Sequence, residues 1–132
     1  MRTEGGDRMA CTQDALDIRV DKPAIGLVVV KVAGEIDILG APALQQRVDE
    51  RLPEACAFVL DLSGATFFGA AGLSVLVHTS VLAERLHVNW ALVCPSSVSR
   101  LLRITELDRD LLVCSEFSEA IVAATAVAPA LS

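Results

Sequence analysis

The first part of the chain carries the hydrophobic pattern of two β-strands. Residues 16–20 alternate apolar and charged side chains with a period of two, which is typical of a strand with one buried face. Asp21, Lys22 and Pro23 break this alternation, and residues 27–33 follow as an apolar run rich in β-branched side chains. We therefore predict an antiparallel hairpin made of these two strands.

The rest of the chain alternates helical and strand patterns. Pro42 stands where a helix can begin, and Leu44, Val48 and Leu52 recur every four residues, which predicts a helix over 41–52. The short apolar run at 57–62 is typical of a strand buried on both faces, and we expect it at the centre of the sheet. The later predicted elements are a helix at 70–86, a strand at 88–94, a helix at 96–104, a strand at 111–114 and a helix at 115–128 that Ser115, Ser118 and Glu119 help to start. This order predicts an α/β fold with a mixed, mostly parallel sheet of about five strands and four helices.

The helix predicted over 70–86 carries more apolar residues than one packed face needs. A first set at helical spacing predicts a mostly buried helix and consists of Leu73, Leu76, Val77 and Val81. The sheet cannot cover a second set at the same time, namely Ala71, Val75 and Leu82. Cover by a neighbouring helix, a homodimer or a partner protein are the alternatives for this second set.

Size and charge limit the domain organisation and the partners. A chain of 132 residues fits one domain, which we expect at 15–128, with a disordered N-terminal tail at 1–14 and a C-terminal tail at 129–132. Seventeen acidic against eleven basic residues give a net charge of -6, which repels nucleic acid and anionic membrane surfaces. The sequence contains no apolar run long enough to span a membrane and no secretion signal near its start, so we expect a cytoplasmic protein.

The residues that most α/β enzymes need are missing or misplaced. Neither GxxxxGK[ST] nor GxGxxG occurs, and the two histidines, His78 and His87, lie nine positions apart with no acid converging on them. The four cysteines have none of the close spacing of a zinc or redox motif, and we expect buried, reduced thiols at Cys11, Cys56, Cys94 and Cys114. We therefore predict no catalytic residue, no metal site and no cofactor.

A set of short motifs is spread over residues 15–124. The motifs are Gly34-Glu35-Ile36-Asp37, Ala41-Pro42-Ala43-Leu44, Asp61-Leu62-Ser63-Gly64 with Phe67, Gly72-Leu73, Leu92-Val93-Cys94-Pro95, Leu107-Asp108 and Ser118-Glu119-Ala120. In combination they resemble the STAS domain of the anti-sigma factor antagonist (anti-anti-sigma factor) family. The resemblance implies a STAS-like fold and a non-enzymatic regulator of transcription that acts by partner switching.

In that family the regulator binds an anti-sigma factor that is also a serine kinase with an ATP-binding fold, and thereby frees a sigma factor. Phosphorylation of a loop serine releases the kinase. Here Gly69, Ala70 and Ala71 stand where the family has aspartate, serine and serine, so Ala70 marks a degenerate phosphorylation site. We expect no phosphorylation switch at this loop, and the nearby hydroxyls of Ser63, Thr66 and Ser74 are the alternative acceptors.

The resemblance also implies where the partner binds. The expected partner-binding residues are Glu35, Asp37, Phe68, Gly69, Ala70, Ala71, Gly72 and Val75. We expect this end of the domain to be net acidic and to suit a basic partner. The alternative function is a STAS-type sensor module that binds a small ligand or a nucleotide.

Overall fold

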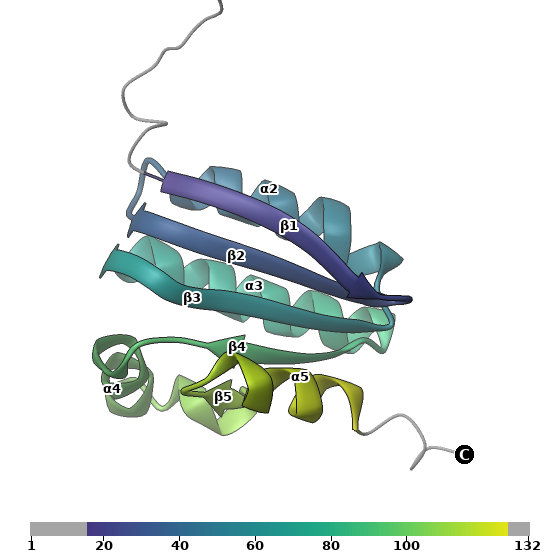
Figure 1. Ribbon diagram of the computed structural model, residues 1–132. Coiled ribbons are helices and arrows are strands. Elements are labelled where there is room, and N and C mark those ends of the chain that lie inside the picture. Colours follow the sequence, from purple (N-terminus) through teal and green to yellow (C-terminus); the bar gives the residue numbers. More distant parts are fainter. Residues whose placement is uncertain (1–15, 127–132) are drawn as a thin grey trace, which may run out of the picture.

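Five strands form one mixed sheet in the order β1-β2-β3-β4-β5 (Figure 1). The computed structural model describes residues 16–126. β1 (Leu16–Ala24) pairs antiparallel with β2 (Leu27–Ile36), as the predicted hairpin requires. β3 (Ala57–Phe68), β4 (Asn89–Val93) and β5 (Val113–Cys114) then add in parallel, which confirms β3 as the central strand.

Four α-helices connect and cover the strands within the described residues. They are α2 (Ala41–Arg51), α3 (Ala70–Leu86), α4 (Ser96–Ile104) and α5 (Phe117–Thr125), with short 3₁₀ helices at Leu52–Glu54 and Leu107–Asp110. The predicted fold class, a mixed sheet of five strands with four helices, is confirmed. The predicted tails at 1–14 and 129–132, the predicted last two residues of the final helix and Cys11 lie outside the described residues.

Two cores lie on opposite faces of the sheet. α2 and α3 cover one face, and α5 covers the other over β3 and β4 (Figure 1). Phe58, Leu60 and Leu62 of β3 alternate into the larger core, where Leu44 and Val48 of α2 meet them. The smaller core joins the alternate positions of β2, β3 and β4 to two alanines of α5 and includes Val29, Val59, Ala91, Val93, Ala120 and Ala124. The period-two pattern of the strands therefore decides which helix each residue contacts.

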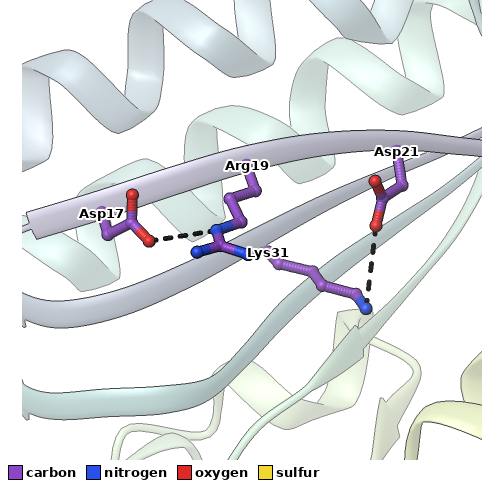
Figure 2. A network of polar contacts seen from close by, with 4 residues as sticks. All are labelled: Asp17, Arg19, Asp21 and Lys31. Atoms are coloured by element: carbon purple, nitrogen blue, oxygen red, sulfur yellow. Dashed lines mark hydrogen bonds and ion pairs between the residues drawn. The ribbon is translucent and has the colours of Figure 1, made fainter.

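β1 and β2 carry charges on the face that α5 leaves uncovered. Arg19 Nε lies 3.3 Å from Asp17 Oδ2, and Lys31 Nζ of β2 lies 3.7 Å from Asp21 Oδ2 of β1. Figure 2 shows these two pairs. Lys31 Nζ also lies 5.0 Å from the ring centroid of Phe117, at the start of α5. This face is polar where no helix packs on it, and each exposed ion pair adds little to stability.

Three strands are longer than predicted, including β2, which continues past residue 33 to Ile36. Asp21, Lys22 and Pro23 do not end β1, because an edge strand tolerates proline and the register shifts between Asp21 and Ala24. β3 continues beyond Leu62 to Phe68 with a second irregularity, where Ala33 pairs with Gly64. A Cβ atom on Gly64 would lie 2.9 Å from the Cβ of Ala33, so glycine permits this close approach. The segment after Leu62 is therefore a strand and not the loop that the sequence predicted.

The C-terminal elements begin later than predicted. β5 has two residues, and the segment before it forms a 3₁₀ helix over Leu107–Asp110. α5 begins at Phe117, so Ser115 precedes the helix instead of opening it. The Glu119 carboxylate nevertheless accepts hydrogen bonds from the backbone N–H and the hydroxyl of Ser115, at 3.2 and 3.4 Å. The predicted polar residues at the start of α5 therefore do interact, but Ser115 lies before the helix and donates to the Glu119 side chain inside it.

α3 turns a different face inward than the first apolar set predicted. Val75, Leu76, Thr79 and Ala83 are buried, whereas Val77 and Val81 are 44% and 49% exposed. The hydroxyl of Thr79 donates to the carbonyl of Val75 at 2.8 Å, which satisfies a polar group inside the core. Ala71 and Leu82 pack against the larger core, so cover within the chain accounts for the second set. The prediction that Val77 and Val81 are buried is wrong.

Candidate functional site

The C-terminal ends of β2 and β3 bring the sequence-predicted residues to one end of the sheet. Glu35 pairs with Phe67 and Ile36 pairs with Phe68 in the strand register. The N–H of Gly69 then donates to the carbonyl of Ile36 at 3.1 Å, which fixes the start of α3 beside β2. The end of a parallel strand followed by a helix N-terminus is where open α/β sheets usually bind their partners.

Asp37 shapes the turn that follows β2. Its Oδ1 atom accepts the backbone N–H groups of Leu39 at 3.0 Å and Gly40 at 2.9 Å. This side-chain-to-backbone turn holds Ile38 and Leu39 outward, where they are 79% and 67% exposed. The sequence analysis placed Asp37 in the partner contact but did not single out Ile38 and Leu39. Two consecutive large apolar residues outside any predicted helix or strand could have indicated an exposed apolar surface here.

The start of α3 offers backbone and methyl groups but no side-chain hydroxyl. Gly69 is the N-cap in an extended conformation, and no side chain caps the helix. Ala70 is exposed, and Ala71 and Gly69 are half-buried. The family resemblance places the phosphate acceptor among Gly69, Ala70 and Ala71. These residues have only hydrogen or methyl side chains, and Ala70 is the most accessible of them.

Three predicted contact residues lie deeper than expected. Val75 and Gly72 are buried, and Phe68 is half-buried against the larger core. Phe67 instead points to the surface and is 53% exposed. Val75 and Gly72 thus pack beneath the surface, Phe68 is partly accessible, and the role of all three in partner binding stays a prediction. We call the exposed residues Glu35, Ile38, Leu39, Phe67 and Ala70 the loop surface.

Gly72 lets α3 pack closely on Phe68. A Cβ atom at Gly72 would lie 2.6 Å from Cε1 of Phe68, well inside van der Waals contact. We expect Gly72→Ala to lower the free energy of unfolding in urea by about 1–3 kcal/mol through overpacking, and Phe68→Leu to restore part of that loss. Gly69→Ala is the matched control, because its Cβ would lie 3.1 Å from Cε2 of Phe67, whose half-exposed ring has room to shift toward solvent. Equal losses for the two alanine variants would contradict this packing.

The loop surface is acidic at its edge. Glu35 is exposed and forms no ion pair or side-chain hydrogen bond with any residue between 16 and 126. The Asp37 carboxylate is already occupied by the turn. Glu35 is therefore the carboxylate here that is free to pair with a basic group on another molecule.

The other chemically active side chains lie away from the loop surface. His78 Nε2 of α3 lies 2.6 Å from Asp49 Oδ1 of α2, and this contact joins the two helices. Burial, with a smaller contribution from Cys114, raises the pKa of the Cys94 thiol to about 11, so it stays protonated at neutral pH. Cys56 is exposed, against the prediction of a buried thiol. Within residues 16–126 no cluster of three metal-ligating side chains occurs, and no helix is long and apolar enough to cross a membrane.

Comparison with known proteins identifies the class of domain. The sequence profile of the STAS domain family matches residues 16–120. The anti-sigma-F factor antagonist RsfB of Mycobacterium tuberculosis, from strains CDC 1551 / Oshkosh and ATCC 25618 / H37Rv, is 36% identical over 76 residues. The match covers 57% of this chain and 62% of each relative, so the chain spans about three fifths of the curated relatives' length.

Solved structures agree with the sequence matches. An anti-sigma factor antagonist from Mycobacterium paratuberculosis has a TM-score of 0.75 and 30% identity, covering 85% of this chain and 96% of the other. The unphosphorylated form of the anti-sigma factor antagonist SpoIIAA shares the fold at 16% identity, with a TM-score of 0.66 and coverage of 80% and 94%. The chain belongs to the STAS domain family, and its structural relatives include anti-sigma factor antagonists.

Proposed function

We propose that this protein is an anti-sigma factor antagonist that binds an anti-sigma factor through the loop surface and thereby frees a sigma factor. The similarity to RsfB and to the M. paratuberculosis antagonist supports this function. The observation that carries it is the exposure of Ile38, Leu39 and Phe67 together at one end of the sheet, next to the exposed Glu35, which has no partner among residues 16–126. Large apolar side chains gathered on the surface of a small domain mark an interaction site. The protein acts by binding, without chemistry of its own.

The partner in this proposal is an anti-sigma factor with a kinase-like ATP-binding fold, and the complex forms in the cytoplasm. The net charge of -6 and the free Glu35 favour a partner with a basic contact surface. Affinity capture with the full chain as bait, followed by mass spectrometry, tests this. We expect an ATP-binding anti-sigma factor that Ala70→Asp no longer retains. Capture of no such protein by the wild type would contradict the proposal.

The second part of the proposal is that phosphorylation does not switch this loop. SpoIIAA has been solved in a phosphorylated and an unphosphorylated form, so a protein of this fold accepts a phosphate. A phosphoryl group adds about -1.5 to -2 charges, which a partner surface built to meet apolar groups cannot accommodate. Ala70 and Ala71 have no hydroxyl to accept it. The protein therefore stays in the equivalent of the unphosphorylated, binding state.

Restoring the hydroxyl tests the assignment of Ala70. We expect incubation with the cognate kinase and ATP to leave the mass of the wild-type protein unchanged, and to add one phosphoryl group to Ala70→Ser. Intact-mass spectrometry followed by peptide mapping measures both. A phosphoryl group on Ser63, Thr66 or Ser74 of the wild type would show that the switch has moved to a neighbouring hydroxyl. An unmodified Ala70→Ser variant would show that Ala70 does not mark the acceptor position.

The sensor alternative receives no comparable support at the loop. The crevice beside it, between the end of β3 and the start of α4, is lined by residues such as Thr66, Phe68 and Ser97 and measures about 230 Å³. This is below the range of about 300–1,000 Å³ that is usual for small-molecule sites. A second crevice, which Leu39 lines together with Leu16 and Arg47, measures about 320 Å³ and only reaches the lower end of that range. We therefore propose protein binding, and not nucleotide binding, for the loop surface.

A further inference from the structure

A larger groove lies away from the loop surface. It has a volume of about 530 Å³ and is formed by the C-terminal half of α3, the start of β4 and the segment before β5. Asn89 and Trp90 line it at the N-terminal end of β4, whereas the loop surface lies at the C-terminal ends of β2 and β3. Its volume falls within the range of about 300–1,000 Å³ that is typical of sites for small molecules.

Most of the groove wall is apolar. The apolar lining includes Leu76, Val77, Val81, Leu107, Leu111 and Leu112. Val77 and Val81 of α3 and Leu112 are each about half exposed. A ligand that covered the exposed part of these side chains would bind through the hydrophobic effect.

Three polar side chains of the groove have no partner among residues 16–126. Ser80, Glu84 and Asn89 line it, and their side chains form no hydrogen bond or ion pair with the residues between 16 and 126. Trp90 is only 8% exposed, and its indole N–H donates to no described residue, yet its nitrogen still reaches solvent, because Arg51 Nε is the one fully buried side-chain nitrogen or oxygen without a partner among the described residues. An acceptor carried by a ligand can therefore replace the water that meets this N–H.

We propose that this groove binds a small molecule with a flat apolar body, a hydrogen-bond acceptor for the indole N–H of Trp90, and a protonated amine for the Glu84 carboxylate. A second copy of the chain is disfavoured as the occupant. A two-fold interface centred on the groove brings the two Glu84 carboxylates toward each other, in a protein whose net charge is already -6. An organic cation bound to one chain brings no second carboxylate, pairs with Glu84 and covers the apolar wall.

Trp90 makes the groove directly measurable. The chain has one tryptophan and no tyrosine, so its intrinsic tryptophan fluorescence reports on this groove alone. The probe is dansylcadaverine, which joins a naphthalene ring, sulfonamide oxygens and a primary ammonium group. We expect saturable energy transfer from Trp90 to the dansyl group as the full-length protein is titrated.

Two variants test the groove against nonspecific binding. Ser80→Phe fills the groove and should lower the affinity for dansylcadaverine by at least about tenfold. Ser74→Phe makes the same substitution at an exposed position of α3 that does not line the groove, and should leave binding unchanged. Transfer that does not saturate in the wild type, or that is equal in both phenylalanine variants, would overturn the proposal.

Glu84→Gln tests the charge without filling the groove. This variant should lower the affinity for dansylcadaverine about threefold, as expected for an ion pair at an exposed rim. The affinity for the neutral probe dansylamide should not change. This comparison decides the proposal even if Ser80→Phe does not fold. Equal effects on the two probes would overturn it. So would a wild-type dimer in sedimentation that is lost in Ser80→Phe, because the groove would then belong to a second copy of the chain.

Discussion

Ala70→Asp is expected to weaken the complex with the anti-sigma factor by at least about a hundredfold while the domain stays folded. Ala70 is the exposed first residue of α3, at the centre of the proposed contact. A carboxylate there must lose its hydration when the partner binds, and a buried charge without a counter-ion costs about 3 kcal/mol or more. At about 1.4 kcal/mol per tenfold change in affinity, that cost corresponds to at least about a hundredfold.

The stability of Ala70→Asp should not fall, because a negative charge in the first turn interacts favourably with the helix dipole. Isothermal titration calorimetry measures the affinity, and urea denaturation measures the stability. Val122→Asp is the control, since Val122 is an exposed apolar residue of α5, a helix that covers the opposite face of the sheet from α3. It should bind as the wild type does. Equal affinities for the wild type and Ala70→Asp would exclude the loop surface as the interface.

Phe67→Ala is expected to produce the second largest loss, about thirtyfold in affinity. Phe67 is the one aromatic side chain of the loop surface and is half exposed before any partner binds. Buried aromatic anchors at interface centres commonly contribute about 2 kcal/mol or more, and about 1.4 kcal/mol corresponds to tenfold. The loss should appear as faster dissociation in surface plasmon resonance, because truncated contacts act mainly on the dissociation rate.

Ile25→Ala is the matched control for Phe67→Ala. Ile25 lies fully exposed in the turn between β1 and β2, at the opposite end of β2 from Glu35. Removing it deletes a similar amount of exposed apolar surface away from the contact. Unchanged dissociation for Phe67→Ala, or an equal change for Ile25→Ala, would show that apolar exposure alone does not define the interface.

The order of strands and helices could be predicted because each element carries its own hydrophobic period. The end of β3 could not, because Ser63 and Gly64 carry a turn-like signature while pairing with β2 through an irregular register. The side chains after Leu62 do not keep a strict period of two, because Ala65 and Phe68, three residues apart, both pack against the larger core while Phe67 is exposed. The two shifts in register between β2 and β3 are the reason, and no hydrophobic pattern in the sequence predicts them.

The orientation of α3 was beyond the sequence for a different reason. Its two apolar sets are similar in size, so the hydrophobic pattern alone does not select the buried face. The choice depends on tertiary contacts, and it buries a threonine whose hydroxyl bonds to its own helix. The same choice buries Val75 and leaves Val77 and Val81 along the groove.

The affinity for the anti-sigma factor, measured by calorimetry before and after incubation of this protein with that kinase and ATP, tests the account most directly. Binding through a loop surface without a phosphate acceptor predicts the same affinity in both samples and no added phosphoryl group. A complex that is lost after incubation, together with the gain of one phosphoryl group, would contradict it.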